Sequence, residues 1–151
     1  MRSLFVAFLL LAAGTACADD LDNLKAAAMH YATAMKAVLA LPQTSGCFET
    51  IAKATEYAAA KMAYYNAARQ AMPALLQMAK GEQTDSRYGE ELTEIFRGFR
   101  EDQDEQATAT LEAKLHQCLR SDERHEALMA VKRAQQIAEQ FIKDFGRLEG
   151  V

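Results

Sequence analysis

Three histidines are the first residues of this chain that could do chemistry, because imidazole is the commonest metal ligand among side chains. Glu112 and His116 are four residues apart, and Asp122 and His125 are three apart, so each pair would share a helix face. A metal centre in a helical bundle is usually built from Glu-x-x-His pairs, and none occurs. The spacing favours solvated histidines and leaves open whether His30, His116 or His125 binds a ligand.

Haem binding is a second possibility, since methionine and histidine both ligate haem iron. The motif C-x-x-C-H is absent, which excludes covalent attachment. Met29, His30 and Met35 could hold a haem without a covalent bond. The methionines are scattered over the predicted helices, however, which is typical of side chains that fill gaps in a core. We expect no cofactor, and a metal or haem carrier remains an alternative.

The sequence does not indicate catalysis by a side-chain nucleophile. The nucleophile motif G-x-S-x-G does not occur. Neighbouring carboxylates at 90–94 and 101–105 could act as an acid and a base, but charged residues on helices usually face solvent. We therefore expect a protein that is not an enzyme.

A contact surface for a partner protein is predicted at two places. Glu101, Asp104 and Glu105 interrupt an apolar stripe, so we expect them to be exposed, to contribute little to stability and to dock a basic partner. Tyr64 and Tyr65 are consecutive and cannot both face a core, so one of them should be exposed and could anchor an interface. The alternative is that both tyrosines only cover the helical core.

The N-terminus has the pattern of an export signal. Arg2 precedes a short apolar run at 4–13, and Ala16-Cys17-Ala18 then places small residues where a signal peptidase cleaves. We predict that residues 1–18 are removed and that 19–151 form a single helical domain in the periplasm.

Two alternatives to a periplasmic protein remain open. The protein could be secreted further, or Cys17 could carry a lipid anchor. Lipoprotein signals usually have leucine three residues before the cysteine, and this chain has Gly14 there. No other apolar run is long enough to span a membrane.

The net charge argues against two classes of partner. Loss of Arg2 with the signal changes the formal net charge from −4 to −5. Nucleic acids and anionic membranes attract clustered lysine and arginine, so neither is an expected partner.

Cys47 and Cys118 are the two cysteines left after the signal is removed. An even number in an oxidising compartment indicates a disulfide. Free thiols or a redox pair are the alternative, but the chain has no C-x-x-C motif.

The elements that must position these residues are all predicted to be helices, since good helix formers dominate the sequence and glycine and proline are rare. The predicted ranges are 20–41, 47–80, 90–119 and 122–148. Pro73 predicts a kink in the second helix. Apolar residues at spacings of three and four predict the buried faces. In the second helix this face includes Phe48, Ile51, Ala58, Met62, Tyr65, Met72 and Leu76.

Four helices with short turns predict an all-α, antiparallel up-down four-helix bundle. Cys47 begins the second helix and Cys118 ends the third, so the bundle would place both cysteines at one end. A domain with a charged patch and without catalytic residues favours a protein that acts by protein–protein contact. Its most specific form is an inhibitor or immunity protein that neutralises a toxin or enzyme in the cell envelope. An envelope chaperone or stress protein is the alternative, and the oligomeric state is not predicted.

Overall fold

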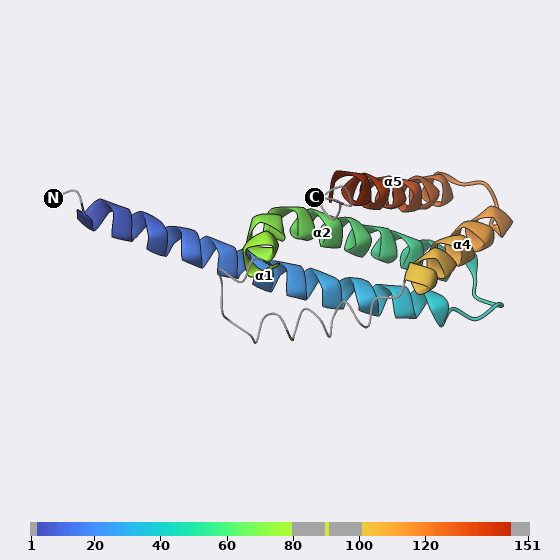
Figure 1. Cartoon of the computed structure of the whole chain (residues 1–151). Helices are drawn as coiled ribbons and strands as arrows, with labels where there is room; N and C mark the ends of the chain where they lie inside the picture. Colours follow the sequence, from blue (N-terminus) through green and yellow to red (C-terminus); the bar gives the residue numbers. More distant parts are fainter. Residues whose placement is uncertain (1–2, 80–89, 91–100, 146–151) are drawn as a thin grey trace.

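The computed structural model of the chain describes residues 3–79, 90 and 101–145, with side chains described for 19–77, 90 and 103–145. Its helices are α1 (Ser3–Leu39), α2 (Cys47–Ala79), α4 (Glu101–Gln117) and α5 (Asp122–Phe145). Figure 1 shows them as an antiparallel bundle in which α2 lies between α1 and α5 and packs mainly on those two helices. The predicted all-α up-down bundle is confirmed, while the predicted helical residues 80, 91–100 and 146–148 lie outside the described residues.

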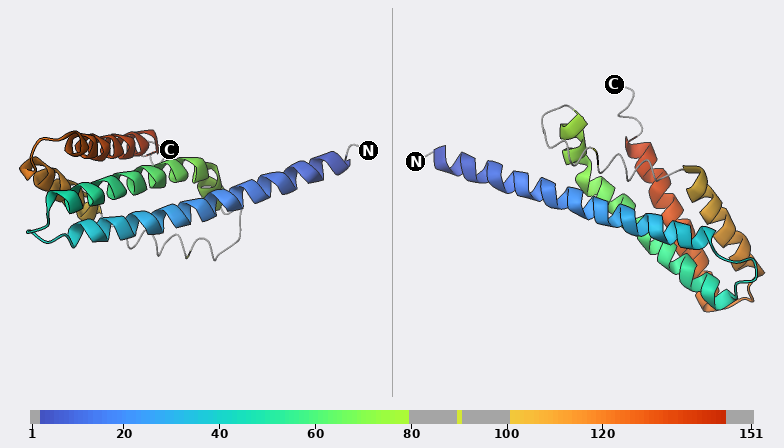
Figure 2. Two further views of the ribbon diagram at one scale, coloured as in Figure 1. Left: turned by 180° about the vertical axis from the view of Figure 1, so that it is seen from behind. Right: turned by 90° about the horizontal axis from the view of Figure 1, so that it is seen from below.

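Helix α1 begins earlier than predicted, at Ser3 rather than near residue 20. Figures 1 and 2 show its N-terminal part extending well beyond the other helices. The segment predicted as an export signal is therefore continuous with the first helix of the bundle. Within the described residues, no helix combines the length and apolarity that crossing a membrane requires.

The buried faces of α1 and α4 are those that the apolar spacing predicts. The core residues of α1 are Leu21, Leu24, Ala28, Tyr31, Ala34, Met35 and Val38. Those of α4 and the residue after it are Ala107, Leu111, Leu115 and Cys118. Apart from the consecutive pair Ala34 and Met35, these residues recur every three or four positions because one side of each helix faces the centre of the bundle.

The buried face predicted for α2 is wrong at both ends. Phe48 is 89% exposed and Leu76 is 40% exposed. Helix α2 contacts α1, α4 and α5, and alanine occurs on most of its sides, so its apolar residues do not mark a single face. The buried set is instead Thr50, Ala54, Tyr57, Ala58, Ala60, Lys61, Tyr64, Ala68, Ala71 and Ala74.

Pro73 lies inside α2, which continues without interruption to Ala79. Figures 1 and 2 show the last turns of α2 (light green) bending away from the axis of the preceding turns. Proline removes one backbone donor and its ring crowds the preceding turn, which bends a helix. The kink predicted near Pro73 is present, without a break.

A disulfide joins Cys47 to Cys118, with their Cα atoms 5.6 Å apart, which confirms the predicted bond. It connects the α1–α2 turn to the α4–α5 turn, which lie at the same end of the bundle (Figures 1 and 2). Lys114 of α4 also donates to the carbonyl oxygen of Pro42 at 2.7 Å and to Ser45 Oγ at 3.2 Å. The cross-link closes a loop worth roughly 4 kcal/mol in the chain-entropy description.

Candidate functional site

Lys61 is fully buried in α2, where a charged side chain is rarely found. Its Nζ atom donates to Asp104 Oδ2 at 2.7 Å, to Gln135 Oε1 at 2.6 Å and to the Tyr57 hydroxyl at 3.4 Å. An ammonium group has three N–H donors, so the three bonds satisfy all of them. Lys61 is thereby fixed in one position between α2, α4 and α5.

Asp104 supplies the opposite charge from α4, and its side chain is 16% exposed. Its Oδ1 atom accepts hydrogen bonds from the hydroxyls of Tyr57, at 2.5 Å, and Tyr31. The Tyr57 hydroxyl also lies 2.9 Å from Thr108 Oγ1. Together these contacts link all four helices. The polar core network, as we name it, consists of Tyr31, Tyr57, Lys61, Asp104, Thr108 and Gln135.

Burial raises the pKa of Tyr31, Tyr57 and Tyr64 well above the usual value for tyrosine. For Tyr57, the negative charge of Asp104 raises the pKa further. For Tyr31, the neighbouring Tyr57 raises the pKa further, and the charge of Asp104 contributes next. A tyrosinate at either position would face a carboxylate in a medium of low polarity. Both hydroxyls are therefore held protonated as donors to Asp104.

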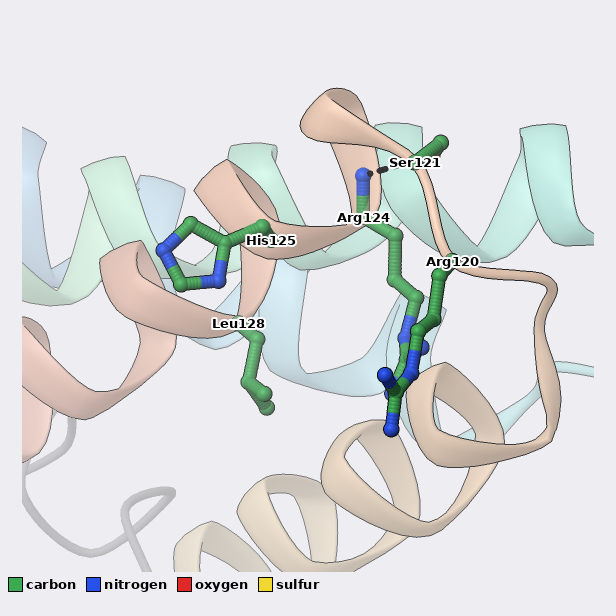
Figure 3. Close-up of a pocket in the computed structure, with 5 residues that line it drawn as sticks. All are labelled: Arg120, Ser121, Arg124, His125 and Leu128. Atoms are coloured by element: carbon green, nitrogen blue, oxygen red, sulfur yellow. Dashed lines mark hydrogen bonds between the residues drawn. The ribbon is translucent and has the colours of Figure 1, made fainter.

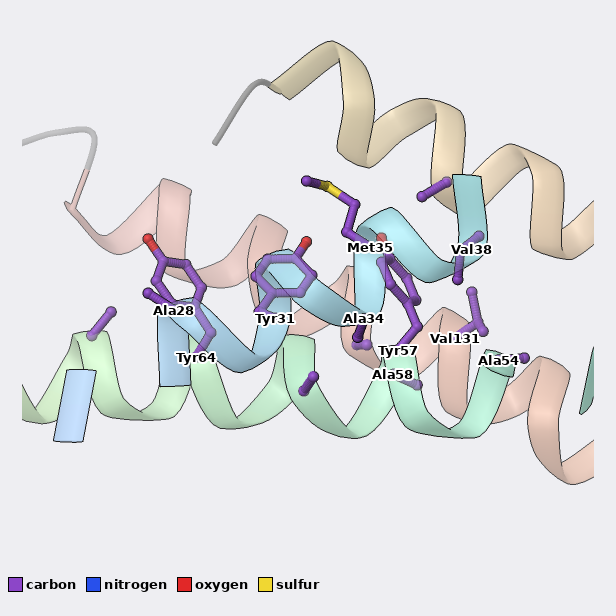
Figure 4. Close-up of a cluster of buried hydrophobic side chains, with 14 of the residues drawn as sticks. Ala28, Tyr31, Ala34, Met35, Val38, Ala54, Tyr57, Ala58, Tyr64 and Val131 are labelled. Carbon is purple, nitrogen blue, oxygen red and sulfur yellow. The ribbon is translucent and has the colours of Figure 1, made fainter. Parts of the chain in front are cut away.

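Aromatic rings continue from the polar core network across the bundle. Figure 4 shows Tyr31, Tyr57 and Tyr64 where α1 meets α2. The Tyr31 ring centroid lies 5.8 Å from that of Tyr57 and 5.5 Å from that of Tyr64. Tyr64 contacts Tyr65 edge to face at 5.0 Å, and Tyr65 lies 5.4 Å from Phe141 of α5. These distances are typical of favourable aromatic pairs, so the rings hold α1, α2 and α5 together.

The predicted acidic contact patch is not a single exposed surface. Asp104 points inward to Lys61, so its expected exposure is wrong. Glu105 is exposed as expected. Glu101 begins α4, and its side chain lies outside the described part. A buried cation on the facing helix, which the linear sequence does not reveal, explains the position of Asp104.

The two tyrosines predicted to anchor an interface make different contacts within the bundle. Tyr64 is 7% exposed and packs toward α1, while Tyr65 is half-buried against α5. The expectation that one of the two is partly exposed is confirmed by Tyr65. Burial leaves Tyr64 without the surface that contact with a partner needs.

The histidine and methionine candidates do not converge. His30, His116 and His125 are exposed, and Met29 is 58% exposed while Met35 is buried. Met29, His30 and Met35 therefore do not face a common space. Among the described residues, no three His, Cys, Asp or Glu side chains gather in a way that could hold a metal ion.

Two large apolar side chains are almost fully exposed beside the disulfide. Phe48 follows Cys47 and is 89% exposed, and Leu119 follows Cys118 and is 90% exposed. With the cysteine Cα atoms 5.6 Å apart, the Cα atoms of Phe48 and Leu119 are no more than about 13 Å apart. We call Cys47, Phe48, Cys118 and Leu119 the clamped end. The apolar spacing of the second helix predicted that Phe48 is buried, and it did not reveal this exposed pair, although both residues directly follow the paired cysteines.

Comparison of the chain with protein-family models, with curated proteins and with solved structures gives no match.

Replacing Asp104 by alanine should destabilise the protein by about 3–5 kcal/mol, because Lys61 would remain buried without its counter-charge. The matched control is Glu105→Ala, on the next residue, which is exposed and should change stability by no more than about 0.5 kcal/mol. Urea unfolding of the two variants measures both free energies. Equal, small effects would show that Asp104 is only a surface charge.

Stability should fall as the pH rises above about 10, where tyrosines ionise in the unfolded chain. Tyr31, Tyr57 and Tyr64 have raised pKa values in the fold, so the native state keeps protons that the unfolded state loses. Each retained proton lowers the free energy of unfolding by about 1.4 kcal/mol per pH unit in this range.

Tyrosinate absorbance and circular dichroism, followed together in an alkaline titration, measure this effect. At least three of the five tyrosines should give tyrosinate absorbance only when the helical circular dichroism signal is lost. Full ionisation of all five tyrosines in a protein that stays helical would contradict the assigned hydrogen bonds.

Proposed function

We propose that this chain is an exported helical protein that acts by protein–protein contact, as an inhibitor or immunity protein that neutralises a toxin or enzyme in the cell envelope. The observation that carries the proposal is the clamped end. Phe48 and Leu119 expose 89% and 90% of their surface at positions that a covalent bond holds together. Exposed apolar side chains that gather on one part of the surface mark contact sites, and the Cα atoms of these two residues lie no more than about 13 Å apart.

Rigidity at the clamped end favours an inhibitor. Binding is weakened by the entropy of ordering flexible side chains and loops, and a surface that is already fixed avoids much of this loss. The disulfide and the bonds of Lys114 to Pro42 and Ser45 hold both turns, and the polar core network holds the helices that lead to them. A preformed surface of this kind suits occlusion of one site on one partner.

Export of the protein to the periplasm is part of the proposal. The predicted signal, the disulfide and the N-terminal part of α1, which extends away from the bundle, all support it (Figure 1). A cleavable segment must be reachable by the peptidase, and a disulfide persists in an oxidising compartment.

An envelope chaperone is the second candidate, and scattered exposed apolar residues favour it. Met29, Met129 and Ile142 are 58%, 47% and 53% exposed, on α1 and α5. Flexible methionine-rich surfaces adapt to many partners. A chaperone would use these dispersed side chains, whereas an inhibitor would depend on the clamped end.

Replacing Phe48 and Leu119 together by serine should speed dissociation from the partner at least about tenfold, since apolar anchors act mainly on the off-rate. Because both side chains are exposed, the melting temperature should barely change. The partner is isolated from envelope extract with the oxidised wild-type protein, and surface plasmon resonance then measures the rates. Met129→Ser with Ile142→Ser is the matched control and should leave binding unchanged.

The same proteins are tested for suppression of aggregation of reduced insulin. If suppression of aggregation depends on Met129 and Ile142, and binding does not depend on Phe48 and Leu119, the protein is a chaperone and the inhibitor proposal is overturned. Weaker binding of the wild type after reduction of the disulfide is expected, because the clamped end is then no longer fixed.

A further inference from the structure

A depression of about 300 Å³ lies next to the clamped end, where α5 begins. It is lined by Arg120, Ser121, Arg124, His125 and Leu128. Figure 3 shows Arg120 and Arg124 extending in the same direction, toward α4, with His125 and Leu128 further along α5. The Ser121 hydroxyl accepts a hydrogen bond from the backbone N–H of Arg124 at 3.1 Å, which fixes the first turn of the helix.

The arginines of this depression have no carboxylate partner among the described residues. Within the described residues, neither Arg120 nor Arg124 forms an ion pair. The side-chain contact of Arg124 is with His116 Nδ1, at 3.4 Å. Asp122 and Glu123 belong to the same helical turn but do not line the depression. Arg120 is exposed and Arg124 is half-buried, and both guanidinium groups keep donors that no carboxylate among the described residues occupies.

Two neighbouring guanidinium groups are suited to one kind of ligand. Arginine binds carboxylates through two parallel N–H···O bonds, which adds geometric specificity to the attraction of charge. Leu128 adds an apolar contact in the same depression. Leu119 directly precedes Arg120, so the exposed apolar residue of the clamped end is the chain neighbour of the first residue that lines the depression.

We propose that this depression binds the carboxylates of an acidic segment of the partner protein, while an apolar side chain of that segment packs on Phe48 and Leu119. This inference rests on the proposed function and identifies the chemistry of the partner. It replaces the basic partner expected from Glu101, Asp104 and Glu105, because Asp104 is held by Lys61. Charge complementarity selects the acidic segment as occupant.

The test uses the oxidised, isotope-labelled protein and three probes at equal ionic strength. The first is a blocked peptide of sequence Asp-Glu-Leu-Glu-Asp, and the second is its amide counterpart, Asn-Gln-Leu-Gln-Asn. The third is inorganic phosphate, which has the same oxyanion chemistry without a protein segment. Nuclear magnetic resonance follows the backbone amides and the arginine side-chain N–H groups.

The acidic peptide should shift the signals of Arg120, Arg124, Phe48 and Leu119, and the amide peptide should not. Arg120→Gln and Arg124→Gln should each weaken binding about tenfold, which corresponds to the loss of a charge-assisted hydrogen bond. Arg133→Gln, an exposed position further along α5, is the matched control and should leave the affinity unchanged.

Two results would overturn the inference. Phosphate that binds more tightly than the peptide, without a shift at Phe48 or Leu119, would make the depression a site for small anions. Acidic and amide peptides that bind equally would remove the role of the arginines. Neither result bears on the serine variants of Phe48 and Leu119, so the proposed function can fail or stand separately.

Discussion

The buried ion pair between Lys61 and Asp104 is the interaction on which the rest of the bundle depends. A charge inside a protein is tolerated only when its partners replace the water it has lost. Lys61 has three such partners, on α2, α4 and α5, and Asp104 extends the network to Tyr31 of α1. Among the described residues, no buried side-chain nitrogen or oxygen lacks a hydrogen bond. The four helices are thus joined by one set of directional contacts.

Directional contacts matter here because the surrounding core is rich in alanine. In the part of the chain whose side chains are described, twelve of the buried apolar residues are alanines, which let helices approach closely but select weakly among alternative registers. Sliding α2 by one turn would still bury alanine, but it would separate Lys61 from Asp104 and Gln135. We infer that the polar core network determines the register, and that the disulfide then fixes the end of the bundle that carries Phe48, Leu119 and Arg120.

The sequence predicted what depends on apolar spacing and failed where one residue acts through another helix. The buried face of α1 and the Cys47–Cys118 bond followed from spacing and from the ends of helices. Lys61 was not predicted as a core residue because lysine side chains are usually exposed, and the linear sequence does not show that its partners on α4 and α5 lie beside it. Asp104 was misread for the same reason, and Phe48 because α2 is apolar on several sides.

A double-mutant cycle between Lys61→Met and Asp104→Asn tests the central role of this pair most directly. Methionine keeps the apolar stem of lysine, and asparagine keeps an oxygen that accepts from the two tyrosines. Each single variant leaves one buried charge uncompensated, so both single variants should be strongly destabilised. The double variant should lose much less stability than the sum of the two single losses. Urea unfolding should give a coupling energy of about 2–3 kcal/mol between the two residues. Effects that add to within about 0.5 kcal/mol would contradict the account.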